Sequence, residues 1–269
     1  MSVVTKIEIS SMNALSTVIM EQGYRGDLKR HRSRYLYRGL PNSRYKLVTS
    51  LGRICKSEQG KTEKALLNNF YKYAAQETNA MAQSEWSRMV IGQHHGLPTR
   101  LMDWSYSPLV GLHFATSGID LDSLGKNDVA LWKIDIEELN QLLPPKYKRA
   151  LRQNRAHLFT VSMLENLKID LATYDKDMKD SSLLLLEPLS MDQRIINQYS
   201  FFSAIPSGIS DVERFLDKKT NNSVKYTVHA DLCWRIRDLL DQLNISERMI
   251  YPGLDGIAQW LKRRYYHRG

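Results

Sequence analysis

The stretch of this chain that is richest in reactive side chains is residues 93–116, with the sequence QHHGLPTRLMDWSYSPLVGLHFAT. It combines histidines, an arginine, an aspartate, a tryptophan and serines with Gly96 and Pro98, two residues typical of turns. The proline that follows suits the first turn of a helix, with Ser105 or Ser107 as its cap. We therefore expect a polar loop above the start of a buried helix, which is a favourable place for an anion or a nucleotide.

Three further side chains are candidates for the chemistry of such a site. Arg38 ends a short strand, and its planar guanidinium could clamp a pyrophosphate or form an ion pair with Asp103. Asp103 could act as an acid, or it could shape a turn and pair with Arg100. Glu187 ends an apolar strand just before Pro188, where a carboxylate could face a cleft or simply lie on the surface.

Several residues near these could contact a ligand. His95 could transfer a proton or donate a hydrogen bond to a phosphate. Gln198 could recognise an amide or satisfy a buried backbone group, and Arg194 could brace the site. Trp104 could stack on a base or belong to the core. The predicted ligand-binding residues are Arg38, Gly39, His95, Thr99, Arg100, Trp104, Arg194 and Gln198.

We expect no metal site. His94 and His95 are adjacent, so their side chains diverge on a strand or a helix, and no matching cluster of ligands lies near them in the sequence. The motifs GxSxG, GxGxxG and the P-loop are also absent, so serine hydrolase, Rossmann and ATPase activities lack their usual signals.

The charge of the chain favours an anionic partner. The 269 residues carry a net charge of +9, which attracts nucleic acid, phosphate-rich ligands or anionic lipid, although a soluble protein can also simply be basic. The basic segments 146–155 and 262–268 could contact nucleic acid or form solvated faces.

The chain has two cysteines, no signal-peptide pattern at its start and no apolar run long enough to span a bilayer. These features predict a cytoplasmic protein that does not interact with membranes.

The pattern of apolar residues predicts one α+β domain over residues 1–269, with a mixed or antiparallel sheet flanked by helices. Residues 1–30 should form a strand and then a helix capped by Ser11, and residues 25–34 a surface loop. Further strands are expected at 35–37, 127–137, in the apolar segment around 183–186, and at 225–231, and helices at 61–91, 138–156, 207–222, 231–243 and the C-terminus; 157–182 is ambiguous.

Four segments of the chain resemble the signature blocks of the FRG-domain family. They are YRGLPNSRYKLVTSLGR, the central stretch already described, EPLSMDQRIINQYSFF and ISERMIYPGLDGIAQWL, which together extend from residue 35 to about 261. The family takes its name from a Phe-Arg-Gly motif, and Tyr37 stands here in place of the phenylalanine.

The order of these elements is also similar to the Arg–Ser–Glu layout of ADP-ribosyltransferases. That resemblance implies a split sheet and NAD as substrate, with Arg38 holding NAD, Ser105 or Ser107 shaping the nicotinamide pocket, and Glu187 contacting the ribose. The third block departs from the pattern, because its signature residues are Arg194 and Gln198 rather than the expected glutamate.

The resemblance implies an NAD-dependent ADP-ribosyltransferase or NAD glycohydrolase, which could serve as a toxin or an anti-phage defence effector. Its catalytic residues would be Arg38, Ser105, Glu187 and Asp103, and its acceptor would be a protein, a nucleic acid or water. A module that binds nucleic acid or nucleotides without catalysis is the alternative, and an interaction scaffold is a third possibility.

Overall fold

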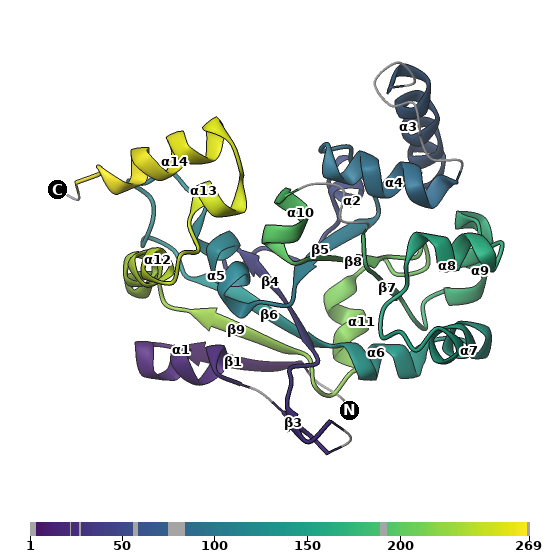
Figure 1. The fold of residues 1–269 in the computed structure, drawn as a ribbon, viewed down its shortest axis with the longest axis horizontal. Coiled ribbons are helices and arrows are strands. Elements are labelled where there is room, and N and C mark those ends of the chain that lie inside the picture. Colours follow the sequence, from purple (N-terminus) through teal and green to yellow (C-terminus); the bar gives the residue numbers. More distant parts are fainter. Residues whose placement is uncertain are drawn as a thin grey trace.

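The computed structural model describes residues 4–21, 23–26, 28–55, 59–74, 84–188 and 193–267. Its centre is a seven-stranded sheet in which every neighbouring pair is antiparallel except β1 and β9, which are parallel (Figure 1). In spatial order the strands are β1 (Thr5–Ile9), β9 (Val224–Val228), β6 (Val129–Asp135), β4 (Tyr35–Leu40), β5 (Leu101–Ser105), β8 (Ser200–Ala204) and β7 (Leu184–Leu186). A separate small hairpin joins β2 (Tyr24–Arg25) and β3 (Arg30–His31).

Fourteen α-helices in the described residues surround this sheet. They are α1 (Met12–Ile19), α2 (Ser50–Ile54), α3 (Gln59–Ala74), α4 (Glu85–His94), α5 (Pro108–Thr116), α6 (Ile136–Leu142), α7 (Pro145–Gln153), α8 (Val161–Asn166), α9 (Leu171–Met178), α10 (Gln193–Gln198), α11 (Val212–Lys219), α12 (Cys233–Gln242), α13 (Glu247–Ile250) and α14 (Leu254–Arg264). A single 3₁₀ turn, η1 (Ala230–Leu232), precedes α12. The α+β class and the mixed sheet are thus confirmed, whereas the finer likeness to ADP-ribosyltransferases stays a prediction.

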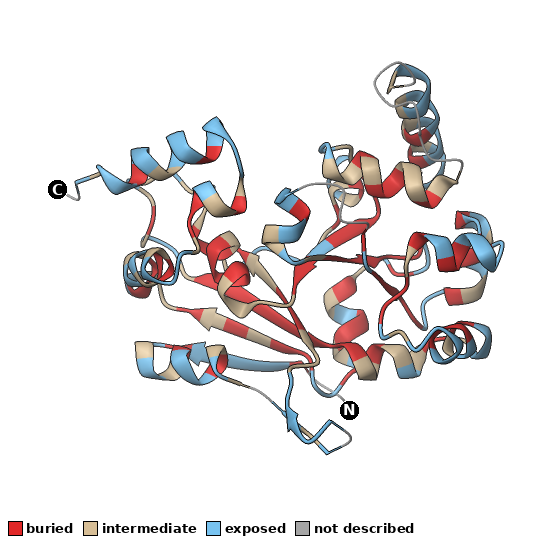
Figure 2. Ribbon diagram, in the orientation of Figure 1, coloured by how far each residue is buried: buried red, intermediate tan, exposed pale blue. Residues whose placement is uncertain are grey.

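The central strands are buried on both faces, as Figure 2 shows by their colour. Because side chains alternate along a strand, neighbouring residues of β5 join different cores. Leu101 packs in the cluster with α4, α8 and α9, whereas Met102 and Trp104 pack in the cluster with α6 and α11. A third cluster fills the space between the sheet and α1, α5 and α12.

The sheet parts between β4 and β5. Strand β4 pairs with β6 through six residues, but it pairs with β5 only where Tyr37 lies opposite Ser105. The four strands β1, β9, β6 and β4 therefore diverge from the three strands β5, β8 and β7, and the space between the two parts opens beside Arg38.

Helix α5 lies unusually close to β4, and Gly39 permits this approach. A Cβ atom at Gly39 would lie 1.9 Å from the carbonyl oxygen of Gly111 and 2.4 Å from the backbone nitrogen of Ala115, both in α5. Any side chain at this position would push the helix away from the strand. The glycine of the Tyr-Arg-Gly motif therefore has a packing role.

Several local predictions agree with the structure. Ser11 caps α1 by accepting a hydrogen bond from the Ala14 amide, and Ser107 caps α5, which begins with a proline as expected. The strand expected at 127–137 is β6, and the one expected at 225–231 is β9. The helix expected at 138–156 is divided into α6 and α7, because Pro144 and Pro145 interrupt it.

One loop prediction was wrong. The expected polar loop around Asp103 is strand β5, in which four of five residues are buried and only Asp103 is exposed. The turn-forming residues of this stretch flank the strand rather than interrupt it. The segment 25–34, expected as a surface loop, lies at the surface in its described residues and also contributes Arg25 and Arg30–His31 to the short β2–β3 pairing. No helix in the described ranges is both long enough and apolar enough to cross a membrane.

Candidate functional site

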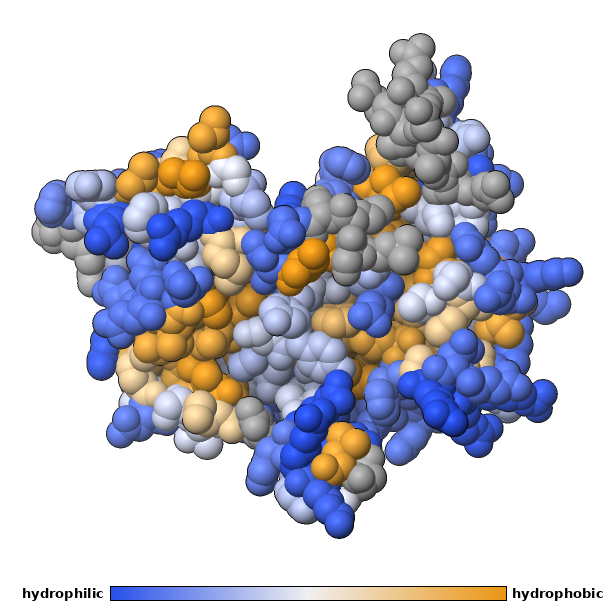
Figure 3. Space-filling model, in the orientation of Figure 1, coloured by the Kyte–Doolittle hydropathy of each residue, from blue (hydrophilic) through white to orange (hydrophobic). Residues whose placement is uncertain are grey.

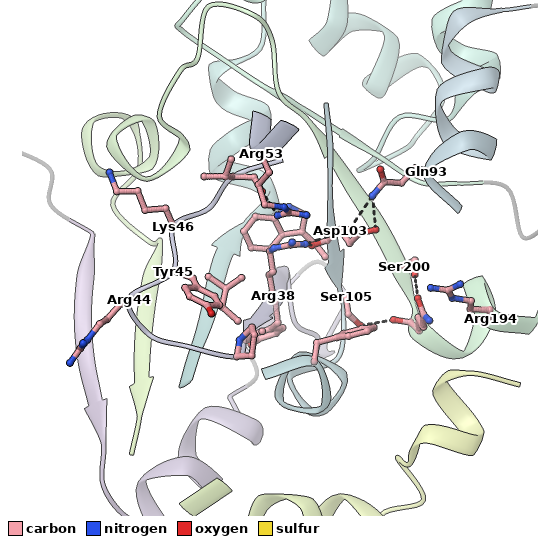
Figure 4. Close-up of a pocket in the computed structure, with 18 residues that line it drawn as sticks. Arg38, Arg44, Tyr45, Lys46, Arg53, Gln93, Asp103, Ser105, Arg194 and Ser200 are labelled. Atoms are coloured by element: carbon pink, nitrogen blue, oxygen red, sulfur yellow. Dashed lines mark hydrogen bonds and ion pairs between the residues drawn. The ribbon is translucent and has the colours of Figure 1, made fainter. Parts of the chain in front are cut away.

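A cavity of about 810 Å³ opens where β4 and β5 part (Figure 4). Its walls come from β4, the segment 41–48 that follows it, the end of α2, strand β5 and the helix α10 with the start of β8. The volume falls in the range of roughly 300–1,000 Å³ typical of pockets for small ligands and cofactors. The cavity therefore lies at the point where the sheet opens, a place set by the topology.

Arg38 forms the floor of this cavity. Its Nη1 donates a hydrogen bond to the backbone carbonyl of Asp103 at 2.6 Å and lies 3.5 Å from the Asp103 carboxylate. The side chain is only 17% exposed, and its buried Nε has no hydrogen-bond partner among the described residues. Burial lowers the pKa of the guanidinium and Arg53 adds to this, while Asp103 acts in the opposite direction. Arg38 is therefore a largely buried cation at the cavity wall, with Asp103 as its carboxylate partner.

Other cations line the same cavity without carboxylate partners. The Arg53 guanidinium donates to the backbone carbonyl of Val48 at 3.0 Å, and Arg194 lies over the ring of Tyr251 at 5.3 Å. Within the described part of the chain, neither of these arginines, nor Arg44, forms an ion pair.

The buried arginines outside the cavity are different, because each of them pairs with carboxylates. These arginines are Arg100, Arg237 and Arg263. Apart from Arg38, which lies 3.5 Å from the Asp103 carboxylate, the arginines that line the cavity have no ion pair within the described residues, so the cavity carries excess positive charge.

Asp103 is the one carboxylate that lines the cavity among the described residues. Its side chain is 54% exposed and projects from β5 toward Arg38. The amide nitrogen of Gln93 lies 3.2 Å from both carboxylate oxygens. Gln93 in turn accepts a hydrogen bond from the hydroxyl of Thr99 at 2.6 Å, so a short relay of side chains fixes the carboxylate.

On the opposite side of Asp103, Ser105 and Gln198 form a polar wall. The Ser105 hydroxyl donates to the backbone carbonyl of Gln198 at 2.8 Å. The Gln198 side chain donates to the carbonyl of Ile250 at 3.1 Å and accepts from the Ser200 hydroxyl at 3.3 Å. These bonds attach α10 both to β5 and to α13, so the wall is rigid.

Aromatic rings supply the apolar part of the lining. Trp104 and Tyr37 are 3% and 1% exposed, so most of each ring belongs to the cores. The Trp104 nitrogen donates to the hydroxyl of Ser203 at 2.9 Å. Phe114 of α5 completes this wall. The cavity therefore combines apolar surface with a few fixed polar groups, as ligand sites generally do.

Residues 33–123 match the family model described as the FRG domain. The chain carries an FRG domain. Comparisons with curated proteins and with solved structures find no match.

The FRG domain extends from β4 through α5 and supplies Arg38, Arg53 and Asp103 to the cavity. The residues of its Tyr-Arg-Gly motif have different roles. Arg38 lines the cavity, and Gly39 lies against α5. Arg194 lies outside the matched segment, so the later strands and helices complete the cavity.

Four of the residues predicted for the site do not line the cavity. Arg100 is buried and its guanidinium binds Glu63, with Nε 2.7 Å from a carboxylate oxygen, and Asp175 at 2.6 Å. This ion cluster joins β5 to α3 and α9. Thr99 does not line the cavity, but its hydroxyl donates a hydrogen bond to Gln93, which does. His95 is the C-terminal cap residue of α4.

Glu187 is the fourth of these residues. It is exposed at the end of β7, and its backbone N–H donates to the carbonyl of Phe159 at 2.7 Å. The residues predicted for the site that do line the cavity are Arg38, Gly39, Asp103, Trp104, Ser105, Arg194 and Gln198. Of the two carboxylates predicted for the site, only Asp103 lines the cavity.

Sequence reasoning gave no role in the site to six polar lining residues of this cavity: Arg44, Tyr45, Lys46, Arg53, Gln93 and Ser200. The first three are consecutive and follow the turn after the Tyr-Arg-Gly motif, and a basic–aromatic–basic triplet is a usable signal for a nucleotide. Arg53 and Gln93 carry no such local signal.

A buried ion network joins α12, α13 and α14, and α13 contacts the cavity wall through Gln198. Glu247 contacts Arg237 of α12 and accepts hydrogen bonds from Arg263 of α14 at 2.7 and 2.8 Å. Arg263 also donates to Asp241 at 2.7 and 2.9 Å. Burial and the Arg237 charge lower the pKa of His113, 3.0 Å from Arg237, to about 3, so His113 is neutral. Helices α12, α13 and α14 are thereby fastened together.

The two basic segments predicted for nucleic acid do not form one surface. Helix α7 and helix α14 lie at opposite ends of the molecule (Figure 1). Figure 3 shows hydrophilic side chains over α7 and apolar ones along α14, where Leu254 is 83% exposed. Arg263 of the second segment is buried in the ion network. The described residues contain no group of three metal-ligating side chains.

Proposed function

We propose that the cavity binds a nucleotide with a pyrophosphate group, with NAD as the ligand, and that Asp103 promotes cleavage of its nicotinamide–ribose bond. The observation that carries this proposal is the excess of arginines over carboxylates in a cavity of about 810 Å³: Arg38, Arg53 and Arg194 line it, and of these only Arg38 pairs with the one exposed carboxylate, Asp103. The volume supports a dinucleotide rather than a simple phosphate ion.

The arginines account for the anionic part of the ligand. Guanidinium groups bind phosphate oxygens in a planar, two-pronged geometry, and such charge-assisted bonds are stronger when they are shielded from water. Arg38 and Arg53 both line the cavity, and the charge of Arg53 is close enough to lower the pKa of Arg38. A pyrophosphate between these two side chains would relieve the repulsion between their charges.

Asp103 is the residue that would promote cleavage of the nicotinamide–ribose bond. When the C–N bond between ribose and nicotinamide breaks, its electron pair leaves with nicotinamide and positive charge develops on the ribose ring. A fixed carboxylate beside the ring stabilises that charge. The nucleophile, water or a hydroxyl of an acceptor, then bonds to the same carbon and loses its proton to the carboxylate or to solvent. Gln93 holds Asp103 in place for this step.

The test measures binding and turnover separately. Purified protein is incubated with NAD, and released nicotinamide is quantified by chromatography, while binding of ADP-ribose is measured by titration calorimetry. Asp103→Asn should lower nicotinamide release by at least about a hundredfold, in line with losses of one fixed electrostatic group. The same variant should bind ADP-ribose at least as tightly, because it loses the negative charge of the cavity.

Two control variants sharpen the result. Glu187→Gln alters a carboxylate outside the cavity and should keep full turnover. Arg53→Gln removes a cation whose hydrogen bond is to Val48 and should weaken ADP-ribose binding without unfolding the protein. A folded protein that binds neither NAD nor ADP-ribose would refute the proposal.

The alternative function is nucleotide binding without catalysis. The specific observation in its favour is that the Asp103 carboxylate is already engaged by Gln93 and Arg38. In that case ADP-ribose binds, Asp103→Asn strengthens binding, and no nicotinamide is released by either protein.

A further inference from the structure

The rim of the cavity carries a second cationic group that a pyrophosphate does not use. Arg44, Tyr45 and Lys46 line the cavity on the side away from Arg194 (Figure 4). In this view the charged ends of Arg44 and Lys46 point away from Arg38, out of the cavity. They can therefore contact only a ligand that extends beyond the mouth of the cavity.

The backbone holds these three residues in a fixed turn. The side chain of Asn42 accepts a hydrogen bond from the Arg44 amide at 2.9 Å, and its carbonyl accepts one from the Tyr45 amide at 3.0 Å. After the turn, Leu47 is buried, and its amide donates to Glu213 at 2.9 Å. The triplet is thus anchored on both sides, although its side chains are exposed.

The charges of the rim are only weakly compensated. Lys46 lies 3.9 Å from Asp211, with both side chains well exposed, so this ion pair is weak. The Glu213 carboxylate is occupied by the Leu47 amide. For Arg44 the described residues provide no ion pair. The rim therefore carries net positive charge at the mouth of the cavity.

The net negative charge of NAD is smaller than the positive charge of the residues that line this cavity. Its pyrophosphate carries two negative charges and its nicotinamide ring one positive charge. Arg38, Arg53 and Arg194 already exceed that requirement, with Asp103 as their one opposing charge in the lining. Arg44 and Lys46 remain for an additional anionic group.

We infer that the cavity selects a dinucleotide with a further phosphate on the ribose of its adenosine half, that is, NADP rather than NAD. The inference rests on the proposed function. Tyr45 is 56% exposed at the rim and offers its ring to the adenine base. Arg44 and Lys46 then contact the ribose phosphate, in the way that an arginine distinguishes NADP from NAD in other dinucleotide sites.

The experiment compares ADP-ribose with 2′-phospho-ADP-ribose, since neither contains the bond that the protein is proposed to cleave. Dissociation constants are measured by calorimetry at fixed ionic strength. The phosphorylated ligand should bind the unaltered protein at least about tenfold more tightly, as expected for one added charge-assisted contact. In the double variant Arg44→Gln/Lys46→Gln the two affinities should become nearly equal, while ADP-ribose itself binds as before.

A matched control removes the same amount of charge elsewhere. Arg149 and Arg152 are exposed on α7, away from the cavity, so Arg149→Gln/Arg152→Gln should keep the full preference. Tyr45→Ala should weaken both ligands by a similar factor, because both contain adenine.

The outcomes separate this inference from the proposed function. Equal binding of the two ligands by the unaltered protein overturns the inference and leaves nucleotide binding intact. Absence of binding by both ligands overturns the proposed function and the inference with it. A short single-stranded oligonucleotide that binds more tightly than 2′-phospho-ADP-ribose, through Arg44 and Lys46, also overturns the inference, because the rim would then serve a polynucleotide.

Discussion

Replacement of Gly39 by alanine would place a methyl group where helix α5 already lies. The new carbon would be 1.9 Å from the carbonyl oxygen of Gly111 and 2.4 Å from the nitrogen of Ala115. Both are backbone atoms, so no side chain can rotate away. Since comfortable contacts between heavy atoms need roughly 3.5 Å, the helix would have to move outward by about 1.5 Å.

The cost of this movement follows from what α5 buries. Its residues Leu112 and Ala115 are fully buried in the third core cluster, opposite Tyr37 of β4. Overpacking of a core typically costs about 1–3 kcal/mol. Because the clash involves backbone and displaces a whole helix, we expect Gly39→Ala to lower the free energy of unfolding by about 3 kcal/mol.

Urea denaturation followed by tryptophan fluorescence measures this change. Gly60→Ala is the matched control, because a Cβ at that position of α3 meets no atom within 4 Å. Alanine there should leave the stability unchanged or slightly raised. Phe114 of α5 lines the cavity, so Gly39→Ala should also weaken binding of ADP-ribose. If Gly39→Ala unfolds at the same urea concentration as the unaltered protein, the close approach of α5 does not explain this glycine.

Two other predictions concern the buried ion clusters. Glu63→Gln removes one of the two carboxylates that pair with Arg100 and leaves Asp175 in place, so it should lower the free energy of unfolding by about 1–3 kcal/mol, with ADP-ribose affinity unchanged in the protein that remains folded; weakened binding at normal stability would instead assign Arg100 to the site. Burial acts to raise the pKa of Glu247, but hydrogen bonds from Arg263 and the charge of Arg237 outweigh it and lower the pKa to about 2, from an ordinary value of 4.5. The stabilisation from this carboxylate is therefore complete above about pH 4.5 and is lost as the pH falls toward 2, by about 3 kcal/mol. Denaturation curves between pH 6 and pH 3 should show this loss in the unaltered protein and a smaller pH dependence in Glu247→Gln; equal slopes in the two proteins would contradict it.

Much of the local structure could be predicted from the sequence because it depends on neighbours in the chain. Ser11 caps α1, and the proline after Ser107 begins α5, since both effects act within one helical turn. Strand β5 was not predicted, because its five residues lie between turn formers whose backbone preferences dominate a short segment. Pairing with β8 through all five residues decides its conformation, and that partner is about a hundred positions away.

The same distinction applies to the site. Arg38 and Arg100 look alike in sequence, since each precedes or follows a turn containing glycine or proline. Arg100 has a structural role because Glu63, from a helix distant in sequence, binds its guanidinium. Likewise Asp103 and Glu187 are both carboxylates near strand ends, and the opening of the sheet beside Arg38 decides which of them reaches the cavity.

The hydrogen bond from Arg38 to the Asp103 backbone has a consequence for experiments on this cavity. The main-chain oxygen of Asp103 in β5 accepts a hydrogen bond from the side chain of Arg38 in β4. In a regular antiparallel pair, a backbone N–H group of the neighbouring strand would donate such a bond. The guanidinium therefore lies between two strands that pair at one residue only, and it joins them by a side-chain hydrogen bond. A variant without it could close the hollow altogether, so its failure to bind a nucleotide would report on shape as much as on charge. Arg53 and Arg194, which hold no strands apart, are the cleaner positions at which to measure electrostatic recognition.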